Sequence, residues 1–296
     1  MPPTSKPRVF RDPVHDIIDT GLHGPSARLI GALIDTPAVQ RLRFVRQLGL
    51  AHLVFHGAEH SRFSHSLGVY HVARRMLDRL PALDERDRVV ALCAALLHDI
   101  GHAPFSHVME RVSGTHHEAV SAALVTSPET AVHAQLAAFD PTLPDAVAAM
   151  LTGRADGPAA HVVSSQLDAD RADYLLRDAH MTGIGVGRYD LERILLCLHA
   201  DDTGLLVDDG ARESVEGYLV ARFHMYRLVY FHRVVRAAEA MLEQLFARAK
   251  QRCGQGALAP PTHPALAAML RGEAPPPRDW LRFGDPTIWA ALDAWR

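Results

Sequence analysis

Hydrophobic residues recur every three or four positions along most of this chain, which is the spacing of α-helices with one buried face. The pair Thr36-Pro37 combines an N-cap residue with a proline, and it begins a predicted helix over residues 38–48 that ends at Gly49. Residues 89–97 form an almost wholly apolar run after the capping residue Asp84, which predicts a helix buried on all sides. The pattern therefore predicts an all-α fold.

The other periodic segments predict further helices over residues 65–80, 104–110, 116–126, 144–152, 168–181, 211–250 and 285–292. Asp201-Asp-Thr-Gly204 is a turn sequence between short apolar runs, so we expect one small β-hairpin near residues 198–208 and no other. Residues 251–279 are rich in Pro, Gly and Ala and predict a loop or loose linker. We expect a helical core over residues 1–250, on which residues 251–296 pack as a linker and a terminal helix.

Charge and cysteine content narrow the classes of function. The formal net charge of −3 gives no overall basic field, so we do not expect binding to nucleic acid. Cys93, Cys197 and Cys253 are isolated, which argues against a disulfide framework and fits a reducing cytoplasm. The longest apolar run, residues 89–97, is too short to cross a bilayer, so we expect a cytoplasmic protein without membrane contact.

The pair His98-Asp99 is the strongest chemical signal, because it stands at the end of the apolar run. A buried charge costs several kcal/mol unless a partner or a metal compensates it. Neighbours on a regular helix point about 100° apart, so these two converge only if the helix ends here, as Gly101 indicates. His65 and Asp170 lie on two other predicted helices, and imidazole nitrogen with carboxylate oxygen suits a divalent ion. The alternative for any one histidine is an ordinary hydrogen-bonded core residue.

Three motifs in a fixed order carry a resemblance to a known family. They are Arg62-Phe-Ser-His65-Ser-Leu-Gly68, His98-Asp99-Ile-Gly-His102-Ala-Pro-Phe-Ser-His107 and Asp168-Ala-Asp170-Arg171-Ala-Asp173-Tyr174-Leu-Leu-Arg-Asp178. The chain resembles the HD-domain phosphohydrolases, and within them the SAMHD1-like and dGTPase-like deoxynucleoside triphosphate triphosphohydrolases. The resemblance covers roughly residues 8–235 and implies an HD-domain helical bundle.

The resemblance implies four metal ligands, His65, His98, Asp99 and Asp170. The cofactor would be one divalent transition metal, Mn²⁺, Fe²⁺, Co²⁺, Ni²⁺ or Zn²⁺, with Mg²⁺ as a further option on the phosphate chain. Asp168 is then not a ligand, and we expect it to cap its helix.

Residues beside the predicted metal suit a phosphate chain. The resemblance implies that His102, His107 and His117 contact phosphates, and that Glu110 works with His102 near the scissile bond. We therefore expect His102, Glu110 and His117 to be catalytic, since an imidazole titrating near neutrality can donate to a phosphate or a leaving oxygen. Relatives often carry the shorter Asp where this chain has Glu110. Incidental surface histidines are the alternative.

The spacing of Asp170, Tyr174 and Asp178 places them on one helix face, where an aromatic ring and a carboxylate suit a sugar. The resemblance adds to this substrate-binding set by analogy. Its other expected members are Gln47 and Leu48 beside the deoxyribose, Arg62, His107 and Arg171 on phosphates, and Tyr230 near the sugar and base. Phe231 stands where some relatives have glutamine, and core packing of a long helix is the alternative role for Tyr230 and Phe231.

A regulatory site is also implied by the resemblance. Arg8, Val9, Asp35, Gln40 and Arg43 match positions that hold an activating guanine nucleotide between subunits in tetrameric relatives. A solvated helix face is the alternative interpretation of these residues. We expect a homo-oligomer, either a dimer or a tetramer.

The sequence predicts a metal-dependent enzyme that hydrolyses (deoxy)nucleoside triphosphates to nucleoside and tripolyphosphate, by attack of water on the α-phosphorus. Two alternatives stay open. The same metal chemistry could act on nucleoside monophosphates or on cyclic or modified nucleotides, or the chain could be a non-catalytic nucleotide sensor.

Overall fold

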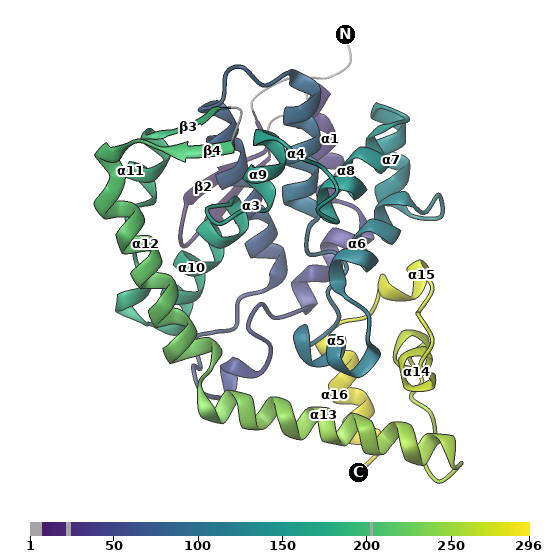
Figure 1. The fold of residues 1–296 in the computed structure, drawn as a ribbon. Coiled ribbons are helices and arrows are strands. Elements are labelled where there is room, and N and C mark those ends of the chain that lie inside the picture. Colours follow the sequence, from purple (N-terminus) through teal and green to yellow (C-terminus); the bar gives the residue numbers. More distant parts are fainter. Residues whose placement is uncertain (1–7, 22–24, 202–203) are drawn as a thin grey trace.

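The computed structural model describes residues 8–21, 25–201 and 204–296, and most of these residues are helical (Figure 1). The predicted all-α fold is confirmed. The α-helices are α1 (Pro25–Ile34), α2 (Pro37–Arg41), α3 (Arg62–Asp78), α4 (Glu85–Leu97), α5 (His107–Ser113), α6 (His117–Thr126), α7 (Ala131–Phe139), α8 (Leu143–Leu151), α9 (Pro158–Val163), α10 (Ala169–Thr182), α11 (Leu191–Leu196), α12 (Arg212–Met225), α13 (Arg233–Gly254), α14 (Pro264–Arg271), α15 (Pro277–Trp280) and α16 (Asp285–Ala294).

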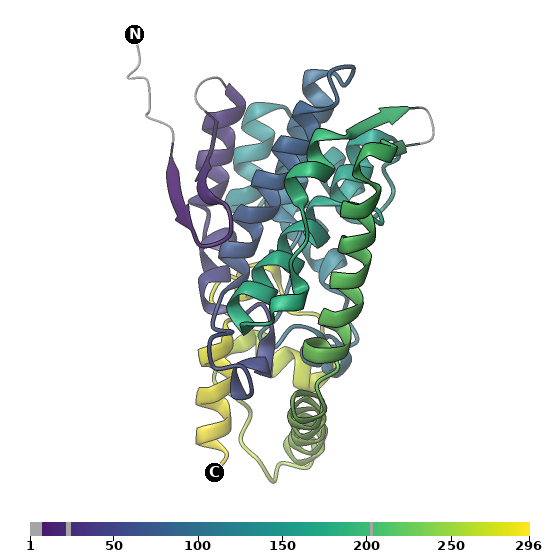
Figure 2. The same ribbon diagram turned by 90° about the vertical axis from the view of Figure 1, so that its left-hand side faces the viewer.

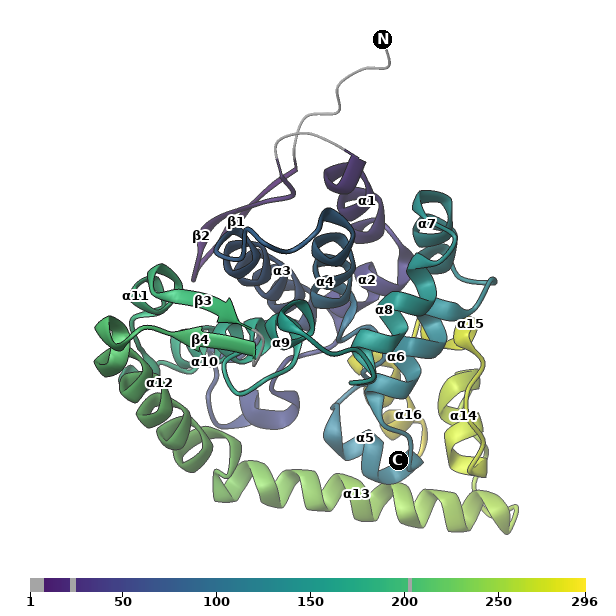
Figure 3. The ribbon, with the colours of Figure 1, turned by 45° about the horizontal axis from the view of Figure 1, so that its top comes forward.

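The centre of the bundle is α3, which packs between α4 and α10 (Figure 3). The predicted burial of α4 is confirmed over Val89–Leu97, where nearly every side chain is inaccessible. Asp84 caps this helix by accepting a hydrogen bond from the Asp87 amide at 2.8 Å, as expected. Asp168 likewise caps α10, accepting from the Arg171 amide at 2.7 Å. Among the described residues, no helix is both long and apolar enough to cross a membrane.

Two antiparallel hairpins accompany the helices. The expected one consists of β3 (Leu198–Asp201) and β4 (Gly204–Val207), although residues 202–203 of its turn lie outside the described residues. The prediction that no other hairpin exists was wrong, because β1 (Val9–Asp12) pairs with β2 (Asp16–Asp19), as Figure 2 shows at the edge of the bundle. Their turn holds Asp16 at φ +57° and carries no glycine, so it lacked the usual hairpin signal.

The helix predicted over residues 38–48 is wrong beyond Arg41. The chain passes through two short 3₁₀ turns, η1 (Leu42–Phe44) and η2 (Gly49–Leu53), with an extended stretch between them. In that stretch the Gln47 amide donates to the His60 carbonyl at 3.0 Å, and the Arg62 amide donates to Val45 at 2.9 Å. Backbone pairing with residues 60–62 therefore replaces helical hydrogen bonds.

The long helix predicted over residues 211–250 is broken in the structure. α12 ends at Met225, a π-helical turn (Tyr226–Tyr230) follows, and α13 starts at Arg233 in a new direction (Figure 1). His232 caps the new helix, since its Nδ1 accepts from the Val234 amide at 3.3 Å. The helix expected over residues 104–110 likewise starts only at His107.

The linker predicted over residues 251–279 was also wrong, because this stretch contains α14 and α15. Leu266, Met269, Phe283 and Ile288 are fully buried and belong to the same hydrophobic core as the central helices. The buried Arg41 joins the two regions: it donates to the carbonyls of Phe283, Ile100 and His102 at 2.6–2.9 Å.

Candidate active site

The four predicted metal ligands converge from three helices. His65 lies in the first turn of α3, His98 and Asp99 follow the last turn of α4, and Asp170 lies in the first turn of α10. Nε2 of His65 is 3.0 Å from Asp170 Oδ1 and 3.2 Å from Nε2 of His98, which is itself 3.2 Å from Asp99 Oδ1. The helix end at residue 97 lets His98 and Asp99 face the same space.

These donors fit a divalent cation. Nδ1 of His65 is hydrogen-bonded to Asp173 Oδ2 at 2.8 Å, and Nδ1 of His98 to the Ala95 carbonyl at 2.9 Å. When each Nδ1 carries the proton, both Nε2 atoms present lone pairs to one point. Facing lone pairs and the Asp170 carboxylate are held together best by a positive charge, and nitrogen with oxygen donors suits a transition metal.

The electrostatics of His65 support the same conclusion. Burial disfavours the charged imidazole, but hydrogen bonds to Asp170 and Asp173 outweigh it and raise the pKa of His65 to about 10. The surrounding carboxylates thus favour a positive charge at this position, which a metal ion can supply in place of a proton.

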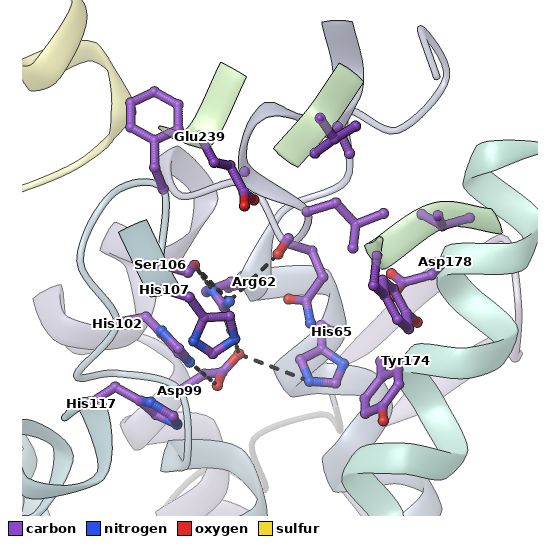
Figure 4. A pocket seen from close by; sticks show the side chains of 18 of the residues that line it. Arg62, His65, Asp99, His102, Ser106, His107, His117, Tyr174, Asp178 and Glu239 are labelled. Carbon is purple, nitrogen blue, oxygen red and sulfur yellow. Dashed lines mark hydrogen bonds and ion pairs between the residues drawn. The ribbon is translucent and has the colours of Figure 1, made fainter. Parts of the chain in front are cut away.

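Asp99 lies between His65 and His102, as Figure 4 shows. Burial favours its protonated form, but Arg62, His98 and His102 hold its pKa well below the ordinary value. Arg62 donates to Asp99 Oδ2 at 2.6 Å and to Ser106 Oγ at 2.6 Å. Arg62 therefore fixes the ligand Asp99 while it also lines the pocket.

The turn that carries Ser106 has an unusual backbone. Phe105 and Ser106 have φ values of +52° and +41°, which L side chains rarely adopt. The arrangement turns Ser106 Oγ toward Arg62 and starts α5 directly at His107.

The predicted catalytic residues form a second group. His102 stacks on His117 with ring centroids 3.7 Å apart. Glu110 lies behind them, with Oε1 2.5 Å from Nδ1 of His117 and Oε2 2.8 Å from Nδ1 of His107. Its pKa stays well below the ordinary value because these hydrogen bonds outweigh its burial. Burial lowers the pKa of His102, whereas for His117 the hydrogen bond that it donates to Glu110 outweighs burial and raises its pKa.

Both groups open into one cavity of about 400 Å³, which is large enough for a small ligand. Seven of the predicted substrate-binding residues line it: Gln47, Leu48, Arg62, His107, Tyr174, Asp178 and Tyr230. Arg171 is the exception and corrects our expectation. Its guanidinium donates to the Ser165 carbonyl at 2.6 Å and pairs with Asp168, so the capping carboxylate turns it away from the cavity.

Tyr174, Asp178 and Tyr230, which we expect to contact a sugar, line the cavity together. Asp178 also has a partner that the sequence did not reveal. Tyr230 donates its hydroxyl to Asp178 Oδ2 at 2.8 Å, and His60 contacts Asp178 Oδ1 at 2.7 Å. The Tyr174 ring meets the Tyr230 ring edge to face at 6.1 Å. His60 stands two positions before Arg62 in sequence, outside any helical spacing, so only the fold could show its role.

The break before α13 forms a further wall that the prediction of an unbroken helix did not reveal. Phe231 in the break, Arg236 and Glu239 of α13, and Arg111 of α5 line the cavity. Figure 4 labels Glu239 at this wall. Burial raises the pKa of Glu239, although Arg236 and Arg111 oppose this.

The five predicted regulatory residues lie on the surface near the β1–β2 hairpin. Arg8 pairs with Asp35, and Gln40 donates to the Ile34 carbonyl at 2.8 Å. Arg43 donates to Gln40 at 2.8 Å. Val9 is 57% exposed.

Two family models match this chain. Residues 62–177 match the HD domain, and residues 189–260 match the HD associated region. The structure is similar to a phosphohydrolase from Bacteroides thetaiotaomicron, with a TM-score of 0.85, 30% identity, and coverage of 98% of this chain and 72% of that one.

Two curated proteins match this chain in sequence. The uncharacterized protein YwfO of Bacillus subtilis is 42% identical over 85% of this chain and 58% of its own length. Deoxynucleoside triphosphate triphosphohydrolase SAMHD1 of Gallus gallus is 31% identical over 82% of this chain and 45% of its own length. The chain thus spans about half the length of the curated relatives it matches. It belongs to the HD-domain phosphohydrolases and resembles their SAMHD1-like members.

Proposed function

We propose that this protein hydrolyses deoxynucleoside triphosphates to nucleoside and tripolyphosphate. The observation that carries the proposal is the shared cavity. It joins the cluster of His65, His98 and Asp170, the neighbouring Asp99, the histidines expected to contact phosphates, and the aromatic and carboxylate wall expected to contact a sugar.

In the reaction, a water oxygen bonds to the α-phosphorus, the bond from that phosphorus to the 5′ oxygen breaks, and the 5′ oxygen takes a proton. A divalent cation held by the four ligands would supply polarisation of a phosphoryl oxygen and activation of the water. Arg62 carries a fixed positive charge at the cavity wall. Glu110 holds Nδ1 of His117, which leaves Nε2 free to hold or donate a proton.

The sugar preference would come from the wall of Tyr174 and Asp178. Each oxygen of Asp178 has one partner in the protein, and a carboxylate oxygen can accept a second hydrogen bond from a sugar hydroxyl. A ring packed as closely as Tyr174 would disfavour a 2′-hydroxyl.

The decisive experiment incubates metal-loaded protein with each dNTP and NTP and identifies the phosphate product. Tripolyphosphate supports the proposal. Orthophosphate or pyrophosphate alone contradicts it and favours a different nucleotide substrate. The variants His98→Ala and Asp99→Ala should lose both bound metal and activity, and retained turnover would refute their assignment as ligands.

We also propose that the surface of Arg8, Val9, Asp35, Gln40 and Arg43 binds an activating guanine nucleotide in a homo-oligomer. The support is that Arg8–Asp35 and Arg43–Gln40 place charged and amide groups on one exposed face. Added GTP should change the mass measured by light scattering and the rate of hydrolysis, and no change in either would refute this part.

A further inference from the structure

A buried network of charged groups lies on the Nδ1 side of His65. Asp173 of α10 is fully buried, and its Oδ2 is 2.8 Å from His65 Nδ1. Arg177, one turn later, donates to both oxygens of the same carboxylate at 2.8 and 2.9 Å. A carboxylate clamped in this way has one fixed orientation, and so does the imidazole that it holds.

The network extends to the β1–β2 hairpin, more than 150 residues away in sequence. His15 Nε2 is 2.7 Å from Asp173 Oδ1. Asp12 accepts from Arg177 at 2.7 and 3.2 Å, and also from the amides of Val14 and His15 at 2.9 and 3.0 Å. The same carboxylate thus shapes the hairpin turn and locks it to α10.

Gly68 makes this close approach possible. A Cβ at this position on α3 would lie 1.8 Å from Asp173 Oδ1 and 2.4 Å from Arg177 Nη2. Gly68 is one turn beyond His65, so the missing side chain leaves the space in which the carboxylate reaches the imidazole.

We infer that Asp173, clamped by Arg177 and by His15 of the β1–β2 hairpin, is a positioning residue that sets the tautomer and orientation of the metal ligand His65. The inference rests on the metal site of the proposed function. It makes the hairpin, which supplies no metal ligand, part of what determines the affinity for metal.

The buried charge beside His65 also supports a role for Asp173 in metal binding. The buried Asp173 carboxylate lies 2.8 Å from His65 Nδ1 and is kept ionised by Arg177. A negative charge at this distance favours a cation on the Nε2 side of the same ring. A contact that only fastened the hairpin to the bundle would not need a carboxylate beside His65. Asp19 of β2 already pairs with Arg74 of α3 at 2.6 Å, without touching His65.

The test measures Mn²⁺ binding to the chelator-treated protein, from the electron paramagnetic resonance signal of free Mn²⁺. Asp173→Asn keeps the size of the side chain and removes its charge, so Mn²⁺ should bind about 10–100-fold more weakly. His15→Gln disturbs one contact of Asp173, and we expect weakening of about two- to tenfold. The milder variant decides the question if Asp173→Asn does not fold.

Asp19→Asn is the matched control, since it loosens the same hairpin but leaves the contacts of Asp173 in place. It should bind Mn²⁺ within about twofold of the wild type. Wild-type affinity in folded Asp173→Asn or in His15→Gln would overturn the inference, as would equal weakening in Asp19→Asn. If the wild type binds Mn²⁺ no better than His98→Ala, the metal site itself fails; if only the network variants behave like wild type, this inference fails alone.

Discussion

The ligand cluster and the α13 wall face the same cavity but are built in different ways. His65 and Asp99 are buried and hydrogen-bonded to further buried groups, whereas the side chains of His98 and Asp170 are 15% and 34% exposed and line the cavity. Across the cavity, Phe231 is 62% exposed and Tyr226 is 37% exposed. The chemistry is thus held by a rigid interior, whereas part of the surface expected to read the substrate is open to solvent and free to vary.

The difference begins in the backbone. The ligand cluster stands on α3, α4 and α10, and α4 and α10 both pack directly against α3. The opposite wall follows a π-helical turn and a break at residues 231–232, where regular hydrogen bonding is interrupted. Substitutions in the ligand cluster should therefore abolish function, whereas substitutions in the opposite wall should only adjust it.

The largest effect should come from Asp170→Ala. It removes a ligand, so we expect loss of bound metal and a fall in turnover of about a thousandfold or more, equivalent to several kcal/mol of lost Lewis-acid stabilisation. Metal content by mass spectrometry and initial rates check this. Asp168→Ala, two positions away, removes the cap of α10 and the partner of Arg171 but no predicted metal ligand; it should cost about 1–2 kcal/mol of stability and keep its metal.

Gly68→Ala should be the next most damaging, through stability. The added Cβ would meet Asp173 Oδ1 at 1.8 Å and force apart a buried ion pair, at a cost of about 3–5 kcal/mol in the free energy of unfolding. Urea denaturation measures it. Gly31→Ala in α1 meets nothing within 4 Å and should be neutral or slightly stabilising; equal losses in both variants would contradict the close packing at Gly68.

Tyr230→Phe probes the boundary between the two regions. It removes the hydroxyl that donates to Asp178, so kcat/KM for a dNTP should fall about tenfold while metal binding stays unchanged. Tyr218→Phe is the matched control, because Tyr218 donates to the Gln166 carbonyl instead. A loss of metal in Tyr230→Phe would show that the two regions are not separable.

The smallest effect should come from Phe231→Gln on the open wall. Its ring is largely exposed, so the relative kcat/KM values for the four dNTPs should change by less than about tenfold, with stability unchanged within about 0.5 kcal/mol. Steady-state rates on each dNTP check this. A collapse of activity for all four would move Phe231 into the rigid part of the site.

The sequence was most informative where local spacing determines geometry. The helix end after residue 97 and the capping roles of Asp84 and Asp168 follow from short-range chemistry, and all three are confirmed. The same reasoning failed where partners distant in sequence decide the structure. The β1–β2 hairpin depends on Arg177, and the pairing of residues 45–47 with 60–62 replaces a helix that the local pattern favours.

The candidate site shows a similar contrast between what the sequence predicts and what only the fold determines. Residue types identified the expected ligands and histidines, but not the direction of each side chain. Arg171 turns to Asp168 because an N-cap carboxylate is the nearest acceptor, and His60 reaches Asp178 only because its strand-like segment returns past α10. The Arg171–Asp168 pair is a local i,i+3 contact that was overlooked, whereas His60 and Asp178 are 118 positions apart and only the fold brings them together.

The left-handed backbone at Phe105 and Ser106 has a consequence for protein engineering. Such conformations cost roughly 1–3 kcal/mol for each residue, and here they aim Ser106 Oγ at Arg62. Ser106→Gly would relieve strain and lose that oxygen in one step. Screens that select only for heat resistance would therefore tend to accept this change and erode turnover, so thermostability and activity need to be selected together at this turn.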